Sequence, residues 1–262
     1  GIVLTISKDG DLLDIIPLAT ASTDKNRIIR PDMIVPFQEP RTSGKAAYFL
    51  CDKVDYLLGI NPKKNCVTKT EFELSASLHE KIIGGNGSEC AVGILAFFRK
   101  WNPEKAFDNP LIKKQEDFSG MMVFRVERKD ALDDESLWNC WYRYYDGKMQ
   151  DRDRCSILGT VNAIGRIHPK IKNIAGGATM GASFVSFNNK AFESYGMEGN
   201  RNSRMSDYVM HAYSSALNYL LSNPYSRIVI GGSTYVCWVE SANESYAQLM
   251  EEFLNPDKEK HM

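Results

Sequence analysis

The 262-residue sequence predicts a mixed α+β fold: a mainly antiparallel sheet, hairpins at both ends of the chain and several packed helices between them. Two strand-like runs flank Asp9-Gly10, and Asp-Gly is a strong signal for a tight hairpin turn. Two more runs flank Gly231-Gly232 near the other end. Apolar residues between the hairpins recur at helical spacing, and no alternation of strands and helices is long enough for a doubly wound parallel sheet.

The first part of the chain is expected to be strand and irregular backbone. The opening hairpin pairs residues 2–6 with residues 12–18. Prolines punctuate residues 26–41 and favour extended, irregular backbone there. A Ser-Gly turn then leads into a short apolar helix over residues 48–58.

Helices are expected in the middle of the chain. Residues 68–83 carry apolar side chains at helical spacing, and a glycine-rich segment ends this helix. Ser88 is a suitable N-cap for the next helix, and Pro103 suits the first position of a short third one. These elements are compatible with a helical insertion at residues 68–115.

The second half mixes strands with two further helices. A strand is expected over residues 121–126, and an aromatic-rich helix over residues 132–145. Core packing is the favoured explanation of those aromatic side chains, and docking to a neighbouring protein is the alternative. An amphipathic helix is expected over residues 206–221. The remaining expected strands are residues 155–158, 183–187, 227–230 and 233–239, with 181–196 expected to be mostly strand and core.

Composition places the chain among ordinary globular proteins. No apolar run approaches the roughly 20 residues of a membrane helix, and no signal peptide is visible, so no membrane partner is expected. Six cysteines are scattered without a Cys-x-x-Cys pair or a nearby histidine, which indicates reduced thiols in a cytoplasmic protein and no metal site. We divide the chain into a region at 1–240 and the start of an acidic, helical C-terminal part at 241–262.

Basic residues are concentrated in two stretches although the net charge is only −1. Residues 152–204 hold eight basic and three acidic side chains, and residues 41–69 hold six and two. Such patches create a local binding field, but a solvated surface gives the same pattern.

The stretch 166–195 is the best candidate for a binding site. Basic residues lead into a glycine turn, and glycines let a phosphate approach the backbone closely because they lack a Cβ atom. A turn without any ligand is the alternative. The candidate DNA-binding residues are Arg166, Lys170, Lys172, Asn173, Gly176 and Gly177, with Arg41, Ser43 and Lys45 as a second, weaker surface.

No catalytic constellation is visible in the sequence. The P-loop, the dinucleotide fingerprint, the Gly-x-Ser-x-Gly elbow and the His-Glu-x-x-His motif are all missing, so we expect neither an enzyme nor a cofactor. His168 is better explained as a packed histidine before a proline than as a catalytic one. An enzyme acting on a phosphorylated small molecule would need a nucleophile or a metal site near Gly176.

Several runs, in order along the chain, resemble one protein family. They are DGDLLDIIPL, RTSGKAAYFLCDKVDYLLGI, RKWNPEKAFDNP, IGRIHPKIKNI, GASFVSFNNKAFESYG, HAYSSALNYLL and TYVCWVES. Together they are similar to the large-subunit family of type I-C CRISPR surveillance (Cascade) complexes. One departure is the turn Cys155-Ser-Ile-Leu-Gly, where the family tends to have Cys-x-x-Thr-Gly.

The resemblance implies a non-enzymatic subunit of an RNA-guided antiviral complex. Such a subunit recognises the protospacer-adjacent motif in double-stranded DNA, aids R-loop formation and supports recruitment of a helicase-nuclease. The implied partners are target DNA, the CRISPR RNA-containing complex with its backbone subunits, and the helicase-nuclease. Family members are about twice as long, so we expect this chain to be an N-terminal region. The alternative is a structural docking subunit without DNA affinity.

Overall fold

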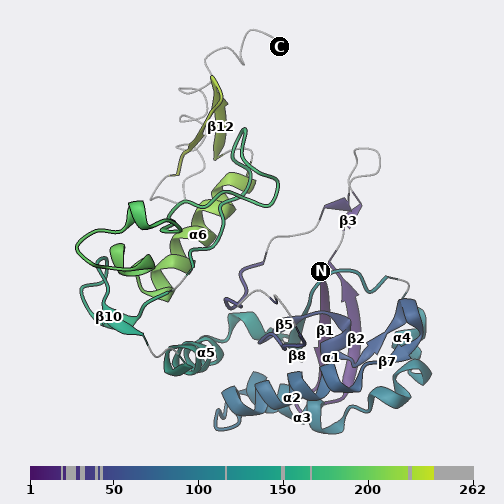
Figure 1. Ribbon diagram of the computed structural model, residues 1–262. Coiled ribbons are helices and arrows are strands. Elements are labelled where there is room, and N and C mark those ends of the chain that lie inside the picture. The colour runs from purple at the N-terminus through teal and green to yellow at the C-terminus, as the bar shows by residue number, and fades with distance from the viewer. Residues whose placement is uncertain are drawn as a thin grey trace, which may run out of the picture. The chain divides into compact units, whose positions relative to one another are not determined.

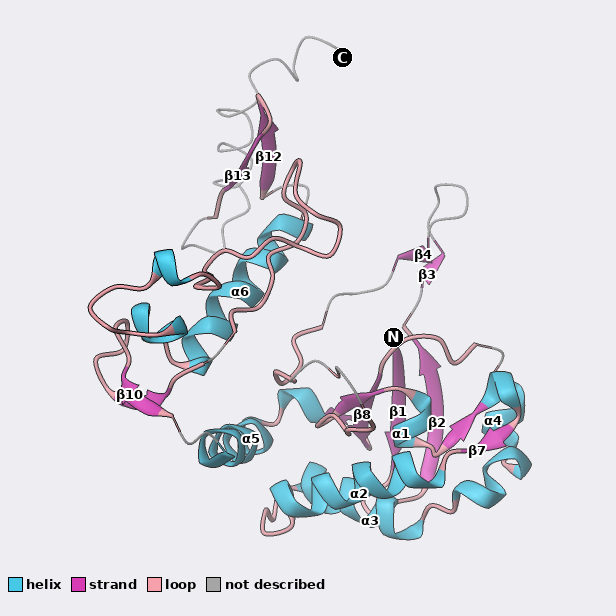
Figure 2. Ribbon diagram, viewed as in Figure 1, coloured by secondary structure: helices cyan, strands magenta, loops and turns pink. Residues whose placement is uncertain are grey.

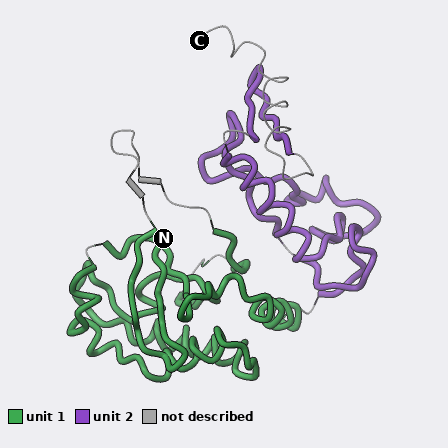
Figure 3. The backbone as a smooth tube through the Cα atoms, turned by 180° about the vertical axis from the view of Figure 1, so that it is seen from behind, with its two compact units in different colours: residues 1–148 green, residues 149–262 purple. Residues whose placement is uncertain are grey.

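The structure, a computed structural model, describes residues 1–18, 20–21, 28–29, 33–38, 41, 44–115, 117–148, 151–165, 167–223 and 226–238. The chain forms two compact units, Gly1–Lys148 and Met149–Met262 (Figure 3). The expected division near residue 240 and the expected acidic helix beyond it lie outside the described residues, so both stay predictions. No helix in the described ranges is long and apolar enough to cross a membrane.

Unit 1 is built on a five-stranded mixed sheet in the order β2-β1-β8-β5, with β9 paired to β8 (Figure 1). Strand β1 pairs antiparallel with β2, which confirms the first hairpin, and parallel with β8. The strands are β1 (Ile2–Ile6), β2 (Leu12–Pro17), β5 (Cys51–Asp52), β8 (Met122–Val126) and β9 (Lys129–Asp130). The predicted α+β class is confirmed.

Both faces of the central strands are buried. Helix α3 (Glu89–Lys100) covers one face, where the ring centroid of Phe124 lies 5.9 Å from that of Phe97. Side chains alternate along a strand, so Val123 faces the opposite side, where it packs with Val3 and Cys51. A Cβ atom on Gly10 (φ +83°) would overlap the α3 backbone, so the hairpin turn requires glycine.

Helices α2 and α3 of unit 1 follow the predicted periodicity closely. Helix α2 is Lys69–Ile83, and the Ser88 side chain accepts the N–H of Ala91 as the expected N-cap of α3. The third helix is a 3-10 helix, η2 (Pro103–Asp108), followed by α4 (Pro110–Lys114). In α5 (Glu135–Lys148), Trp141 and Tyr145 are buried, and Trp141 stacks on Phe49 at 5.4 Å between centroids, which confirms core packing for these two aromatic residues. Tyr142 of the same stripe is 41% exposed.

The predicted helix over residues 48–58 is wrong for most of its length. Only α1 (Val54–Leu57) is helical, because Cys51–Asp52 is extended and pairs with β8. The remaining short elements of unit 1 are β3 (Thr20–Ala21), β4 (Ile28–Ile29), β6 (Ile60–Asn61), η1 (Pro62–Lys64), β7 (Cys66–Val67) and η3 (Ala131–Asp133).

His79 is a completely buried histidine at the centre of unit 1. Its Nε2 accepts the N–H of Leu50 at 3.1 Å, and its Nδ1 lies 2.7 Å from the carbonyl oxygen of Ser75. Both contacts are satisfied by a neutral ring protonated on Nδ1. Burial lowers the pKa of His79 to about 4.

Unit 2 consists of helix α6 (Asp207–Ser222) with a hairpin near each end (Figure 2). Ser206 caps α6 as its N-cap residue, and the closing hairpin around Gly231-Gly232 is confirmed. The other elements are β10 (Arg152–Arg154), β11 (Val161–Ala163), η4 (Lys190–Phe192), η5 (Gly199–Asn202), β12 (Arg227–Ile230) and β13 (Ser233–Val236).

Two strand predictions in unit 2 are wrong. Residues 155–158 form the turn between β10 and β11, in which Gly159 donates its N–H to the Cys155 carbonyl at 2.8 Å. Residues 183–187 are irregular, and Phe184 is 67% exposed, so residues 181–196 are not core. An apolar run needs a pairing partner to become a strand, and the bridge from Ile171 to Ala182 does not extend into this one.

Candidate nucleic-acid interface

The predicted binding loop of unit 2 lies along helix α6. Gly165 packs so closely on Met210 that a Cβ atom would overlap the methionine side chain. His168 Nδ1 then lies 2.6 Å from the Tyr213 hydroxyl oxygen, and Asn218 bonds to the backbone further on. The loop therefore follows the helix in the same chain direction.

Lys170 and Lys172 flank a buried residue. Ile171 is 3% exposed, and it exchanges two backbone hydrogen bonds with Ala182, at 2.9 and 2.8 Å. In extended backbone, residues i and i+2 share a face about 7 Å apart, so both exposed lysines lie on the outer side of the loop. Neither lysine forms an ion pair with a residue that the structure describes. Asn173 (φ +61°) then turns the chain.

The glycine turn exposes its backbone. Gly177 donates its N–H to the Ile174 carbonyl at 3.0 Å, and Gly176 has a φ of +71°, which glycine adopts without strain. No described atom lies within 4 Å of a Cβ position on Gly176. Ala175 anchors the turn by donating its N–H to Thr234 Oγ1 at 2.8 Å. A phosphate group could therefore approach this backbone closely.

His168 is buried behind the loop. It is 4% exposed, and its Nε2 lies 3.5 Å from Ser203 Oγ. Burial and the neighbouring His211 lower the pKa of His168. This geometry is that of a packed, neutral histidine. Its contacts with Tyr213 and Ser203 fix the loop just before the segment that carries Lys170 and Lys172.

Arg41, in unit 1, has several partners already. Its guanidinium lies over the rings of Tyr48 and Tyr56, at 3.8 and 3.9 Å from their centroids, and forms an ion pair with Asp52. Asp52 is completely buried. Burial raises the pKa of Asp52, while the hydrogen bond from Arg41 acts in the opposite direction. These contacts are typical of an arginine that stabilises the fold.

The structure says less about DNA binding for the remaining candidate residues. Lys45 Nζ lies 2.8 Å from a Glu71 carboxylate oxygen, and this hydrogen bond raises the pKa of Lys45. Ser43 and Arg166 lie outside the described residues. The structure thus places the predicted residues Lys170 to Gly177 on one loop of unit 2, and Arg41 and Lys45 in unit 1.

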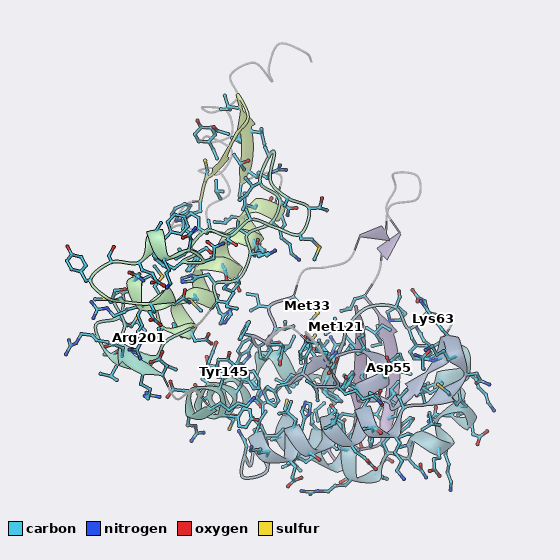
Figure 4. The ribbon with its side chains drawn as sticks, viewed as in Figure 1. Met33, Asp55, Lys63, Met121, Tyr145 and Arg201 are labelled. Atoms are coloured by element: carbon cyan, nitrogen blue, oxygen red, sulfur yellow. The ribbon has the colours of Figure 1, made fainter. Side chains whose placement is uncertain are left out.

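Large apolar side chains are exposed further along the same part of unit 2. Tyr195 is 97% exposed, Met180 77% and Phe192 55%. Arg201, labelled in Figure 4, pairs with Asp151 at 3.0 Å. The sequence prediction missed this exposure, since it assigned residues 181–196 to the core.

Two residues that hold the loop were also missed. Asn218 and Thr234 bond to loop backbone from α6 and β13. The signal for Asn218 was present in the sequence, because it lies four residues after Ser214 and three before Leu221 on the buried face of an amphipathic helix. Thr234 offered no such signal.

The described residues define a two-unit α+β protein whose second unit presents two exposed lysines and an open glycine turn along a helix. Among them, no group of three or more His, Cys, Asp or Glu side chains could hold a metal ion. The chain belongs to the family described as CRISPR-associated protein (Cas_Csd1), which matches residues 1–262. A comparison with curated proteins gave no match. The predicted resemblance is therefore confirmed for a CRISPR-associated protein, and the type I-C large subunit stays a prediction.

Proposed function

We propose that this chain is the DNA-contacting large subunit of a type I-C CRISPR surveillance complex and that it recognises the protospacer-adjacent motif in duplex DNA. Membership of a CRISPR-associated family supports a role in a CRISPR complex. The observation that carries DNA binding is the pair Lys170 and Lys172, exposed on one side of a fixed loop and without a described acidic partner.

The proposed division of work has a physical basis. In RNA-guided complexes, base pairing with the guide reads the target, while protein reads a short duplex motif and the backbone shape. Lysines bind phosphates as point charges, and the open backbone at Gly176 lets a phosphate approach its N–H. The subunit would act in the cytoplasm, aid R-loop formation and support recruitment of the helicase-nuclease, without catalysis of its own.

The test is a salt series of duplex binding by the assembled complex that carries Lys170→Ala/Lys172→Ala. Each lost phosphate contact reduces the slope of log K against log salt by about 0.9, so we expect a flattening of about 2 and weaker binding at low salt. Lys63→Ala/Lys64→Ala is the matched control, because these adjacent lysines are exposed in unit 1. Equal slopes for the wild-type protein and the Lys170/Lys172 variant would exclude these two lysines from DNA binding.

A structural docking role is the second candidate, and the exposed Tyr195 and Phe192 favour it. Aromatic side chains at this exposure are common at protein interfaces. If docking is the main role, Tyr195→Ser/Phe192→Ser would prevent assembly with the backbone subunits, measured by co-purification. If DNA contact is the main role, assembly would survive these changes.

A further inference from the structure

The side chain of Asn218 holds the loop backbone on both sides of Ile171. Its Nδ2 donates to the carbonyl oxygen of Lys170 at 3.1 Å, and its Oδ1 accepts the N–H of Lys172 at 2.8 Å. A planar amide that makes both bonds fixes the orientation of this backbone segment relative to α6.

Asn218 is a half-buried polar residue on α6. It shares the buried face with Ser214, which is 2% exposed, and Leu221, which is 4% exposed. Polar atoms on a covered face need hydrogen-bond partners. For Asn218 the partners are main-chain atoms of Lys170 and Lys172, whose side chains are exposed.

Gly181 restricts the same segment from the other side. It has a φ of +93°, and a Cβ atom there would lie 2.9 Å from Lys170 Cβ and 3.1 Å from the Ile171 carbonyl oxygen. The antiparallel bridge between Ile171 and Ala182 holds the segment on this same side. The segment is therefore held between α6 and residues 181–182.

We infer that Asn218 is a positioning residue for duplex-DNA binding, which fixes the direction in which Lys170 and Lys172 leave the loop without touching the DNA itself. The inference rests on the proposed function of the two lysines. Without the amide, both side chains start from a backbone with more freedom, and ordering them on phosphates costs more entropy.

A double-mutant cycle in the full-length protein within the assembled complex tests this inference. The variants are Asn218→Ala, Lys170→Ala/Lys172→Ala and their combination, and the probe is a fluorescently labelled DNA duplex matched to the guide. We expect Asn218→Ala to weaken binding about three- to tenfold when the lysines are present and less than about twofold when they are absent. Ser215→Ala, on the exposed side of α6, is the matched control.

The outcomes separate the inference from the proposed function. If the lysine variant loses affinity and Asn218→Ala does not, the positioning role is refuted and the proposed function stands. Equal losses from Asn218→Ala in both backgrounds would show that Asn218 acts elsewhere and would also refute the role. An unaffected lysine variant refutes both.

Amide hydrogen exchange supplies a readout that does not depend on DNA. Loss of Asn218 should speed exchange at the Lys172 N–H, since its acceptor is removed, while the Ala182 N–H bonded to Ile171 stays protected. Unchanged exchange at Lys172 would contradict the positioning role.

Discussion

His79 makes the stability of unit 1 depend on pH in a calculable way. Its ring is neutral and buried, with the Leu50 N–H bonded to Nε2 and the Ser75 carbonyl at Nδ1. Burial lowers the pKa from about 6.5 to about 4. The unfolded chain therefore binds a proton at a higher pH than the folded chain does.

The magnitude follows from linkage. The contribution of the neutral His79 ring to the free energy of unfolding is fully present above pH 6.5. It is lost as the pH falls towards 4, and it changes no further below that value. A difference of about 2.5 units at 1.36 kcal/mol per unit gives about 3 kcal/mol of stability lost between pH 7 and pH 4 through this group.

The assay is urea unfolding of the full chain at several pH values, followed by tryptophan fluorescence. Trp141 is a suitable reporter, because it stacks on Phe49, whose ring centroid lies 5.2 Å from that of His79. The comparison variant is His79→Gln, whose amide can replace both hydrogen bonds and does not titrate.

We expect His79→Gln to be less stable than the wild type at pH 7, by about 1–3 kcal/mol from lost packing, with a difference that shrinks as the pH falls. Subtracting the two unfolding free energies removes the contribution of every other titrating group. A difference that stays constant from pH 7 to pH 4.5 would refute the linkage reasoning.

Three further predictions concern other parts of the molecule. Asp52→Ala leaves the Arg41 guanidinium without its ion pair, and we expect a loss of about 3 kcal/mol in urea unfolding; a loss below about 1 kcal/mol would contradict a structural role for this pair. Gly181→Ala should destabilise unit 2 by about 1–2 kcal/mol because of its positive φ, whereas Gly147→Ala, in open space on α5, should stabilise unit 1 by about 0.5–1 kcal/mol; thermal unfolding would contradict this reasoning if the signs agreed. Cys66 is exposed and should react with a thiol reagent much faster than the buried thiols in native protein, as measured by mass spectrometry. The buried thiols are Cys51, Cys90 and Cys155.

Local signals were sufficient wherever a short segment determines its own conformation. The turns at Asp9-Gly10 and Gly231-Gly232 predicted both hairpins, since few residues other than glycine adopt the required backbone. Ser88 predicted the start of α3, because a serine side chain satisfies the free N–H groups of a first turn.

Other predictions failed where residues far away in the sequence decide the local secondary structure. Residues 48–58 as a whole have the composition of a helix, but pairing with β8 makes Cys51–Asp52 a strand. Residues 183–187 have the composition of a strand, but the short bridge between Ile171 and Ala182 does not extend into them. They are therefore irregular. Intrinsic preference is weak compared with tertiary context in both cases.

The sequence by itself determined the α+β class, the CRISPR-associated family and the basic, glycine-containing loop from Lys170 to Gly177. Only the tertiary structure decided that Arg41 is held by Asp52 while Lys170 and Lys172 remain exposed on a loop fixed by Asn218. The reason is that charge and glycine content are properties of a single segment. Whether a charged side chain is occupied or available depends on residues that folding brings to it from elsewhere in the chain.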